Sequence, residues 1–544
     1  MTDNELLNGN SLTAHVKAWI ADDPDPQTAA QLQNWLDSDN EVELRASFSG
    51  FLQFGTAGLR GPVRPGPSGM NRAVVGRAAA GIAAYMQERN LSSVVIGRDA
   101  RHGSEDFTFE TARIMSGAGM QVYVLPRPLP TPVLAFATNE LKCDAGIMVT
   151  ASHNPPQDNG YKVYLGGTVD GIHYRDQIVA PTDEFIAAKI NAITPLASAP
   201  RGETWTIVNE EIINKYIGVT AALAKRPGDL RIVYTALHGV GTQTLLQVFH
   251  KAGFPRPILV GLQAQPDPGF PTVVFPNPEE PGAIDLALET ARACDAHLVI
   301  ANDPDADRCA AAVNDPVTGW RMLRGDELGA VFGETIARTT GKGVLANSIV
   351  SSTILRKIAA HYNLEFRQTL TGFKWLTKID DLAFGYEEAL GYAVDSMTVN
   401  DKDGISAAIK LAQIATDLAT ENKTILDLLD EIWTRHGFHA TEQISIRLRD
   451  ISRVGIIMGR LRKVPPTKIA SYVVTSIDDL TAPTDGLPPT DGLRIWLDGT
   501  IRVIIRPSGT EAKMKCYIEV IEKDSQRAQI VLDQLRAPLK ELLS

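Results

Sequence analysis

Three aspartates in a short polar loop are the residues of this sequence best suited to chemistry. The apolar run HLVIA (297–301) leads almost directly into Asp303, Asp305 and Asp307. Carboxylates at alternate positions point the same way only if the loop curls around something cationic. A divalent ion with oxygen ligands, Mg²⁺ above all, would neutralise carboxylates that otherwise repel one another. The spacing therefore predicts a metal-binding loop.

Three other interpretations of the aspartate loop are an exposed acidic turn, an EF-hand calcium loop and a DxDx[TV] phosphatase loop. The calcium loop fails because, with Asp303 as position 1, position 6 is Arg308 rather than Gly and position 12 is Asn314 rather than Glu. The phosphatase loop also follows a strand, but its fifth residue is Asp307 here. The metal loop is favoured over the exposed turn.

A second apolar run, AGIMV (145–149), breaks into the polar turn TASHNP, which holds Ser152 and His153. A serine there is commonly a helix cap or turn former. A hydrolase triad is disfavoured, because the context is not GxSxG and adjacent side chains are expected to diverge. A hydroxyl that forms a covalent phosphoryl intermediate needs cations, and His153 and Lys162 would supply them locally. Ser152 is therefore a candidate nucleophile.

The segment IIRPSGTEAKMKCYIE (504–519) has the groups of an anion site. Arg506, Ser508 and Thr510 offer side-chain donors, and the Ser-Gly-Thr backbone can turn its amides inward as a nest. A dianionic phosphate would fit, and a plain hairpin turn is the alternative interpretation.

Two further turns carry arginine in this net acidic chain. FGTAGLRG contains Arg60, and GRDAR contains Arg98 and Arg101. Either could be a surface turn, and we expect this of GRDAR especially.

The loops LTGFKW (370–375) and GYEEALGY (385–392) contain polar groups suited to a sugar. Glu387 and Glu388 are adjacent and face apart, so at most one is expected in a shared site and the other in solvent. Lys402 could be tuned for proton transfer by burial beside other cations, but a solvated loop lysine is the favoured interpretation.

The elements that must position these groups follow a repeated plan. Helical patterns at 12–20 and 26–37 precede three strand-loop-helix units at SSVVIGRDAR (92–101), RIVYTALHGVG (231–241) and KGVLANSIVSS (342–352). Three related α/β domains are therefore predicted.

The sequence after residue 436 predicts a fourth, α+β domain. It contains short strands, an Asp498-Gly499 hairpin signal and a closing helix over 525–543. We place the domains at 1–207, 208–322, 323–436 and 437–544.

Composition excludes several classes of protein. Lys and Arg total 53 against 64 Asp and Glu, which disfavours a nucleic-acid or anionic-membrane partner. The 4 cysteines form no CxxC pair, and no apolar run is long enough to span a membrane. The N-terminus has no signal-like apolar run. We expect a cytoplasmic enzyme that is a monomer or homodimer.

With TASHNP, DPDADR, EEALG and RPSGTE in this order, the chain resembles the α-D-phosphohexomutase superfamily over nearly its whole length, closest to its phosphoglucomutase 2/phosphopentomutase branch. The resemblance implies three similar α/β domains with mixed sheets plus a C-terminal α+β domain around a central cleft. It also implies Mg²⁺ as cofactor, a sugar bisphosphate as activator and phosphorylated sugars as substrates.

The resemblance assigns a role to individual residues. Ser152 is implied as the phosphorylated nucleophile, with Asp303, Asp305, Asp307 and a phosphoryl oxygen on Ser152 as metal ligands. Residues implied around the reacting phosphoryl group are Arg60, His153, Lys162, Arg308 and the acid/base Lys402. Residues implied at the sugar and its other phosphate are Thr371, Gly372, Lys374, Glu387, Ala389, Arg506, Ser508, Gly509, Thr510 and Lys515. Ala389 departs from the family, since many hexomutases have Ser there.

The implied activity is a mutase that interconverts hexose 1-phosphate and hexose 6-phosphate, of glucose or mannose, through a phosphoserine and a bound bisphosphate. A phosphopentomutase, a metal-dependent sugar phosphatase and a non-catalytic sugar-phosphate sensor remain as alternatives.

Overall fold

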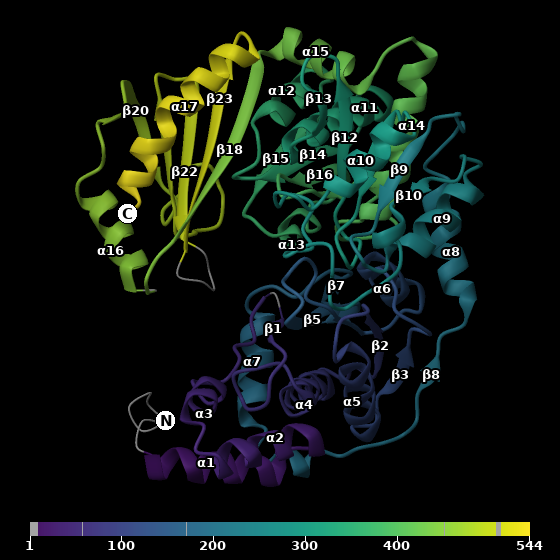
Figure 1. The fold of residues 1–544 in the computed structure, drawn as a ribbon, viewed down its shortest axis with the longest axis vertical. Helices are drawn as coiled ribbons and strands as arrows, with labels where there is room; N and C mark the ends of the chain where they lie inside the picture. Colours follow the sequence, from purple (N-terminus) through teal and green to yellow (C-terminus); the bar gives the residue numbers. More distant parts are fainter. Residues whose placement is uncertain (1–8, 57, 170, 451, 508–512) are drawn as a thin grey trace. The chain divides into compact units, whose positions relative to one another are not determined.

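The computed structural model describes all of the 544 residues except 1–8, 57, 170, 451 and 508–512 (Figure 1). The chain forms two compact units. Unit 1 comprises Met1–Met322 and Gly391–Thr416, and unit 2 comprises Leu323–Leu390 and Asp417–Ser544. The segment 391–416 therefore belongs to the unit of the first two α/β regions, although it follows the third in sequence.

From residue 9 onward, the helices that precede the first sheet are α1 (Gly9–Asp22), α2 (Pro26–Asp37) and α3 (Glu41–Ser47). Helix α2 begins at a proline, and the side chain of Asp25 before it accepts a hydrogen bond from the backbone of Gln27. The proline and the capping aspartate are local signals of a helix N-terminus. The observed bounds of α1 and α2 confirm the helices predicted over 12–20 and 26–37. Helix α3 is not predicted, because seven residues are too few to display a helical period.

The first α/β region supplies a six-stranded sheet of order β1-β5-β4-β2-β3-β8. Its strands are β1 (Leu59–Pro62), β2 (Ser93–Arg98), β3 (Gln121–Val124), β4 (Ala145–Val149), β5 (Asp158–Leu165) and β8 (Thr206–Ile207). Its helices are α4 (Arg72–Glu88), α5 (Ser104–Gly117), α6 (Thr131–Glu140) and α7 (Thr182–Ala192). The region also contains the hairpin of β6 (Gly167–Val169) and β7 (Ile172–Tyr174) and the short helix η1 (Leu196–Ser198). Strand β2 pairs parallel with β3 and β4, and β5 pairs antiparallel with β1 and β4.

Helices cover both faces of this sheet. Val94 and Ile96 of β2 share one buried core with α4 and α5. A Cβ on Gly97 would lie 3.2 Å from Leu134 of α6. Because successive residues of a strand face opposite sides, α6 covers the other face. The loop that carries Ser152 leaves this three-layered region at the end of β4.

The second α/β region also has a mixed sheet, of order β10-β9-β11-β12-β13. Its elements are α8 (Glu210–Ala221), β9 (Ile232–Thr235), α9 (Gly241–Lys251), β10 (Ile258–Leu259), η2 (Gly261–Gln263), α10 (Asp285–Ala293), β11 (Leu298–Ala301), β12 (Ala310–Asp315) and β13 (Gly319–Met322). Strand β9 pairs parallel with β10 and β11, whereas β12 is antiparallel to both of its neighbours. The aspartate loop joins β11 to β12.

The third α/β region lies in unit 2. Its elements there are α11 (Gly325–Thr340), β14 (Val344–Ser348), α12 (Ile354–His361), β15 (Glu365–Thr369), α13 (Phe373–Leu376), β16 (Leu382–Glu387) and α15 (Ile425–His436). Between β16 and α15 the chain passes through β17 (Gly391–Ala393) and α14 (Gly404–Thr420). Strand β14 pairs parallel with β15 and β16, as β2 and β9 pair with their own two neighbours. The three predicted strand-loop-helix copies are thereby confirmed.

The C-terminal region is an antiparallel sheet of order β18-β23-β22-β21-β20-β19, with α17 lying along it (Figure 1). Its elements are β18 (Phe438–Arg447), α16 (Ser452–Lys463), β19 (Lys468–Ile469), β20 (Tyr472–Asp479), β21 (Leu493–Leu497), β22 (Ile501–Pro507), β23 (Lys513–Glu522) and α17 (Ser525–Leu542). Asp498, Gly499 and Thr500 connect β21 to β22, and Asp498 and Gly499 have φ of 47° and 76°, the positive values that the predicted hairpin turn requires. The predicted fold class, three α/β domains plus a C-terminal α+β domain, is confirmed.

The described residues include no helix long and apolar enough to cross a membrane. All 4 cysteines are free thiols, and three of them, Cys143, Cys309 and Cys516, are buried.

Candidate active site

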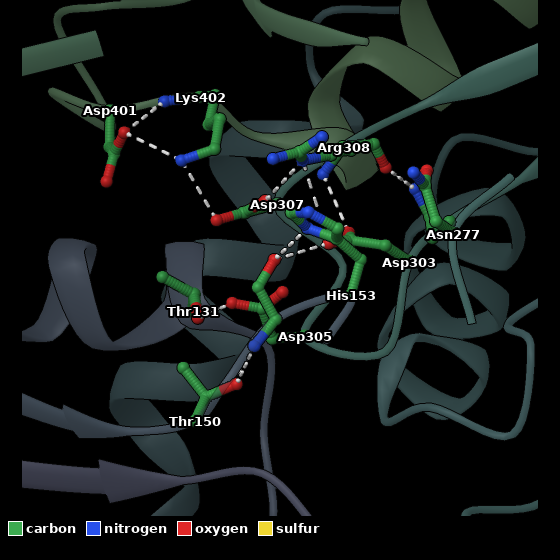
Figure 2. Close-up of polar contacts among 12 residues, drawn as sticks. Thr131, Thr150, His153, Asn277, Asp303, Asp305, Asp307, Arg308, Asp401 and Lys402 are labelled. Atoms are coloured by element: carbon green, nitrogen blue, oxygen red, sulfur yellow. Dashed lines mark hydrogen bonds and ion pairs between the residues drawn. The ribbon is translucent and has the colours of Figure 1, made fainter. Parts of the chain in front are cut away.

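The aspartate loop gathers its three carboxylates at one point of unit 1 (Figure 2). Asp303, Asp305 and Asp307 are each 0% exposed, and one oxygen from each lies within 4.8 Å of the others. Ala306 takes a left-handed backbone conformation, with φ of 54°, where the loop reverses. The curled loop predicted from the alternate spacing is confirmed in geometry.

Two buried lysines offset the charge of this cluster. Lys162 Nζ lies 2.7 Å from Asp305 Oδ2 and 2.8 Å from Asp307 Oδ2, and Lys402 Nζ lies 3.0 Å from Asp307 Oδ2. Burial alone would raise the pKa of Asp307, but the two lysines hold it well below its ordinary value. Burial and the two neighbouring carboxylates raise the pKa of Asp303 well above its ordinary value. The carboxylates therefore form ion pairs with the lysines and also repel one another.

The donor set fits a hard divalent cation. Among the described residues, Asp305 Oδ1 and Asp307 Oδ1 are buried and accept no hydrogen bond, although burial without a partner is costly for a carboxylate oxygen. All ligand atoms on offer are carboxylate oxygens, which Mg²⁺ prefers over nitrogen or sulfur. The cluster can therefore hold a metal ion.

Ser152 lies against this cluster. Its side-chain oxygen donates to Asp303 Oδ2 at 2.8 Å, and its backbone N–H donates to Thr150 Oγ1 at 2.9 Å. The expectation that Ser152 and His153 diverge is wrong, since Ser152 Oγ lies 3.1 Å from His153 Nδ1. The reason is the left-handed conformation of Ser152, with φ of 52°, which turns the two side chains toward each other.

Two arginines lie next to the loop of Ser152 and the aspartate cluster. Arg60 donates to Asn154 Oδ1 at 3.2 Å, and Arg308 Nε lies 3.9 Å from both Asp303 Oδ2 and Asp307 Oδ1. Burial, followed by the charges of Arg308 and Arg60, lowers the pKa of His153 well below its ordinary value. These neighbours disfavour the protonated form of His153, and its role as a cation beside the phosphoryl group stays a prediction.

Lys402 is not the solvated loop lysine favoured by its sequence context. Its side chain is 14% exposed and lies between Asp307 and Asp401. Burial lowers the pKa of Lys402, but these two carboxylates raise it above its ordinary value, so Nζ keeps its proton. Tyr164 Oη donates to Asp401 Oδ2 at 2.8 Å, which anchors the segment of Lys402 within unit 1. This hydrogen bond joins residues 237 positions apart, so the pattern of the local sequence could not predict it.

A second cluster lies in unit 2. Thr371 accepts a hydrogen bond from Arg506, and the next residue, Gly372, donates its backbone N–H to Glu387 Oε1 at 2.6 Å. Gly372 has φ of 110°, a conformation open to glycine. One turn thus connects residues from the predicted sugar loop with Arg506 of the predicted phosphate loop.

The prediction that one of the paired glutamates is solvated is wrong. Glu388 Oε2 accepts from the hydroxyls of Ser348 at 3.2 Å and Ser351 at 3.1 Å, and burial followed by the charge of Glu387 raises the pKa of Glu388. The two glutamates have different partners, as their adjacency predicts.

The other predicted residues of unit 2 belong to the same loops or to the segment that follows Arg506. Lys374, Ala389 and Lys515 are partly exposed. Ser508, Gly509 and Thr510 lie outside the described residues.

Sequence reasoning missed several residues that shape the site. Thr131 donates to Asp305 Oδ2 at 2.6 Å, and Arg101 is buried at 4% exposure against the loop of Ser152. The expectation that GRDAR is a surface turn is therefore wrong at Arg101. No local signal marks these residues, because their partners lie 174 and 51 positions away in sequence.

Comparison with known proteins matches three successive parts of the chain to one family. The models of phosphoglucomutase/phosphomannomutase α/β/α domains I, II and III match residues 52–185, 211–319 and 324–436.

Related proteins cover nearly the whole chain. The probable phosphomannomutase of Haemophilus influenzae is 46% identical over 87% of this chain and 98% of its own length. The human phosphopentomutase is 32% identical over 97% of this chain and 94% of its own length. The crystal structure of Paramecium parafusin, a phosphoglucomutase, shares the fold with a TM-score of 0.70 at 19% identity, covering 91% of this chain and 95% of that chain. The chain belongs to the phosphoglucomutase/phosphomannomutase family.

Proposed function

We propose that this protein is a mutase that interconverts hexose 1-phosphate and hexose 6-phosphate, acting on glucose or mannose phosphates through a phosphoserine at Ser152 and a bound bisphosphate. The observation that carries the proposal is the Ser152 hydroxyl, which lies 2.8 Å from a buried carboxylate of the candidate metal cluster. The 46% identity to a probable phosphomannomutase supports the hexose assignment. A sugar bisphosphate would charge Ser152 with its first phosphoryl group.

In the proposed reaction the free hydroxyl oxygen of a sugar 1-phosphate attacks the phosphorus on Ser152. The new O–P bond forms as the bond to Ser152 Oγ breaks. The sugar hydroxyl loses its proton and Ser152 Oγ gains one, which leaves a sugar bisphosphate and a free serine. After the bisphosphate turns around, Ser152 attacks the other phosphate, so the enzyme is recharged and a sugar 6-phosphate is released. Positioning and electrostatic stabilisation supply most of the rate for such a transfer.

Residues of unit 1 would control charge and protons during transfer. Asp303, Asp305 and Asp307 would hold Mg²⁺, which when bound would offset the negative charge of the phosphoryl oxygens. Lys162 and Arg308 would add positive charge beside them. Lys402 holds a proton at Nζ, so we assign it as the acid that protonates the oxygen released from phosphorus.

Residues of unit 2 would bind the parts of the substrate that do not react. We assign Glu387 and the turn of Thr371 and Gly372 to the sugar hydroxyls, and Arg506 to the non-transferring phosphate. Lys374, Lys515 and the segment 508–510 would complete that binding.

We also propose the four-domain division at 207, 322 and 436, although Lys402 of the third range makes its contacts in unit 1. A cytoplasmic location would keep the four thiols reduced.

A panel of sugar phosphates tests the proposal. With catalytic bisphosphate and Mg²⁺ present, ³¹P NMR should show glucose 1-phosphate and mannose 1-phosphate converted to their 6-phosphates. Release of inorganic phosphate instead would indicate a phosphatase, and binding without conversion would indicate a sensor.

A phosphopentomutase is the second candidate, favoured by the 32% identity to the human phosphopentomutase. If ribose and deoxyribose 1-phosphates exceed the hexoses in kcat/KM by orders of magnitude, this candidate is right.

Ala389→Ser should sharpen the preference among these sugars. Ala389 cannot hydrogen-bond a sugar hydroxyl, whereas a serine would be left unpaired by a sugar that lacks the matching group. One net hydrogen bond of about 0.5 to 1.5 kcal/mol changes a kcat/KM ratio by about two- to twelve-fold. The wild type should therefore act broadly, with hexoses preferred and pentoses turned over detectably. Identical ratios in the two proteins would show that residue 389 has no influence on specificity.

Arg506→Ala should mainly raise KM. A charged hydrogen bond to a phosphate that does not react is similar in the ground and transition states, so its loss, about 1.5 to 3 kcal/mol, raises KM by about 10- to 150-fold with a smaller change in kcat. Arg367→Ala is a suitable control, because that arginine is half exposed and pairs with Glu365 on β15. An unchanged KM in Arg506→Ala would remove this residue from the site.

A further inference from the structure

Arg101 is buried against the loop that carries Ser152. Arg101 lies in the loop that follows β2, and the residue is only 4% exposed. Nη2 donates to the backbone carbonyls of Ser152 at 2.7 Å and Asn154 at 2.6 Å. Nη1 donates to the carbonyls of Pro155 at 2.8 Å and Asp158 at 3.0 Å. One side chain thus binds four carbonyls of a single loop.

Both terminal nitrogens of Arg101 have acceptors in the loop of Ser152. A guanidinium has five N–H groups in a rigid planar fork, and four of them point at the loop carbonyls. The fifth, on Nε, forms no hydrogen bond with the described residues and lies 3.4 Å from Asp99 Oδ2 as part of an ion pair. Asp99 is itself fixed, since its Oδ1 accepts from the backbone of Arg101 at 2.9 Å and from Ser104 Oγ at 2.6 Å. A lysine, with three donors on one nitrogen, could satisfy only part of this arrangement.

The conformation of the nucleophile depends on this loop. Ser152 has φ of 52°, a region that residues other than glycine occupy only where their surroundings hold them there. Arg101 binds the carbonyl of Ser152 itself, and in this conformation the hydroxyl of Ser152 points to Asp303 Oδ2. The direction of the nucleophile is therefore coupled to the guanidinium behind it.

Arg101 also packs against the region of the aspartate loop. Its guanidinium carbon lies 4.9 Å from the ring centre of Phe270, a cation–π distance. Arg101, Phe270 and Pro304 line the same small gap, of about 10 Å³, and Pro304 stands between Asp303 and Asp305. The same side chain therefore contacts the loop of Ser152 and lies next to the loop of the candidate metal ligands.

We propose that Arg101 is a positioning residue for phosphoryl transfer, which holds the Ser152 loop by its four carbonyls so that the nucleophile stays aimed at the aspartate cluster. This inference rests on the proposed mutase function for its catalytic consequence. Its structural consequence, an ordered loop over 150–158, does not depend on that function.

Arg101→Met and Arg101→Lys test the proposal, with Arg98→Met as the matched control. Arg98 belongs to the same GRDAR turn, but it pairs with the exposed Glu105 at 3.1 Å. Misplacement of a reacting group by about 1 Å costs on the order of 100-fold in rate. We therefore expect kcat to fall about 100-fold in Arg101→Met and less in Arg101→Lys. KM should stay within about twofold, because the buried guanidinium leaves no surface for a substrate.

Hydrogen–deuterium exchange of peptides over 150–158 gives a readout that does not require activity. Exchange should rise in Arg101→Met, rise less in Arg101→Lys and remain unchanged in Arg98→Met. Wild-type kcat in Arg101→Met, or unchanged exchange in that loop, would overturn the inference. If Arg101→Met does not fold, Arg101→Lys decides by the same two measurements.

The two hypotheses can fail separately. Absence of mutase activity in the wild type overturns the proposed function and the catalytic part of this inference, while the exchange data still decide whether Arg101 orders the loop. Mutase activity in the wild type with normal kcat in both Arg101 variants overturns this inference alone.

Discussion

Replacing Ser152 with alanine is expected to lower kcat by about 10⁴-fold or more. Without the hydroxyl no covalent phosphoryl intermediate forms, and the remaining groups can bind and polarise the substrate but cannot carry the phosphoryl group between its two ends. Steady-state turnover of glucose 1-phosphate measures the loss. Peptide mass spectrometry should find phosphate on Ser152 in the wild type after incubation with a sugar bisphosphate.

Ser47→Ala provides a control for the Ser152 experiment. Ser47 is also buried, and its hydroxyl forms no hydrogen bond with any of the described residues, so its removal should leave turnover unchanged. Normal turnover in Ser152→Ala, or phosphate found only on another residue, would sink the assignment of the nucleophile.

Asp305→Asn is expected to lower kcat by about 10³-fold and to weaken Mg²⁺ binding. The substitution keeps the size of the side chain but replaces a charged ligand oxygen with an amide. Electrostatic stabilisation by a bound metal is worth several kcal/mol, and each 1.4 kcal/mol is tenfold in rate. Thermal unfolding with and without Mg²⁺ supplies a second readout, because an ion that binds only the folded chain raises its unfolding temperature.

The contacts of Asp305 predict that the variant still folds. Lys162 keeps its ion pair with Asp307, and Thr131 can donate to the amide oxygen as it does to the carboxylate. Asp295→Asn is the control, since the side chain of Asp295 is 96% exposed on the same α/β region. Mg²⁺ should raise the unfolding temperature of this control as it does that of the wild type. Full activity of Asp305→Asn in chelator-treated buffer would refute the metal assignment.

The local elements of this protein follow from local signals. The helix over Pro26–Asp37 is predicted with the bounds that the structure has, because its capping residue Asp25, its first proline and its apolar period are all local. The hairpin at Asp498 and Gly499 is equally local. Helix α16 (Ser452–Lys463) is not predicted, because the short strands around it dominate the pattern of the C-terminal region.

The chemical types of Ser152 and the three aspartates are enough to predict that they lie close together. A hydroxyl after one buried strand and carboxylates after another are the groups that phosphoryl transfer with a metal requires, and the structure places them in contact across 151 positions of sequence. The conformation that achieves this, a left-handed Ser152 facing His153, has no signature in the sequence.

The sequence by itself determined which residues could do chemistry, where the strands and helices lie and the family of the chain. Only the tertiary structure decided which of those residues are buried and which charged groups they contact. Lys402 and Arg101 look like surface residues in their own segments, yet one lies beside Asp307 and the other binds four carbonyls of a distant loop. The physical reason is that desolvation and ion pairing depend on contacts between segments far apart in the chain, and no local pattern encodes them.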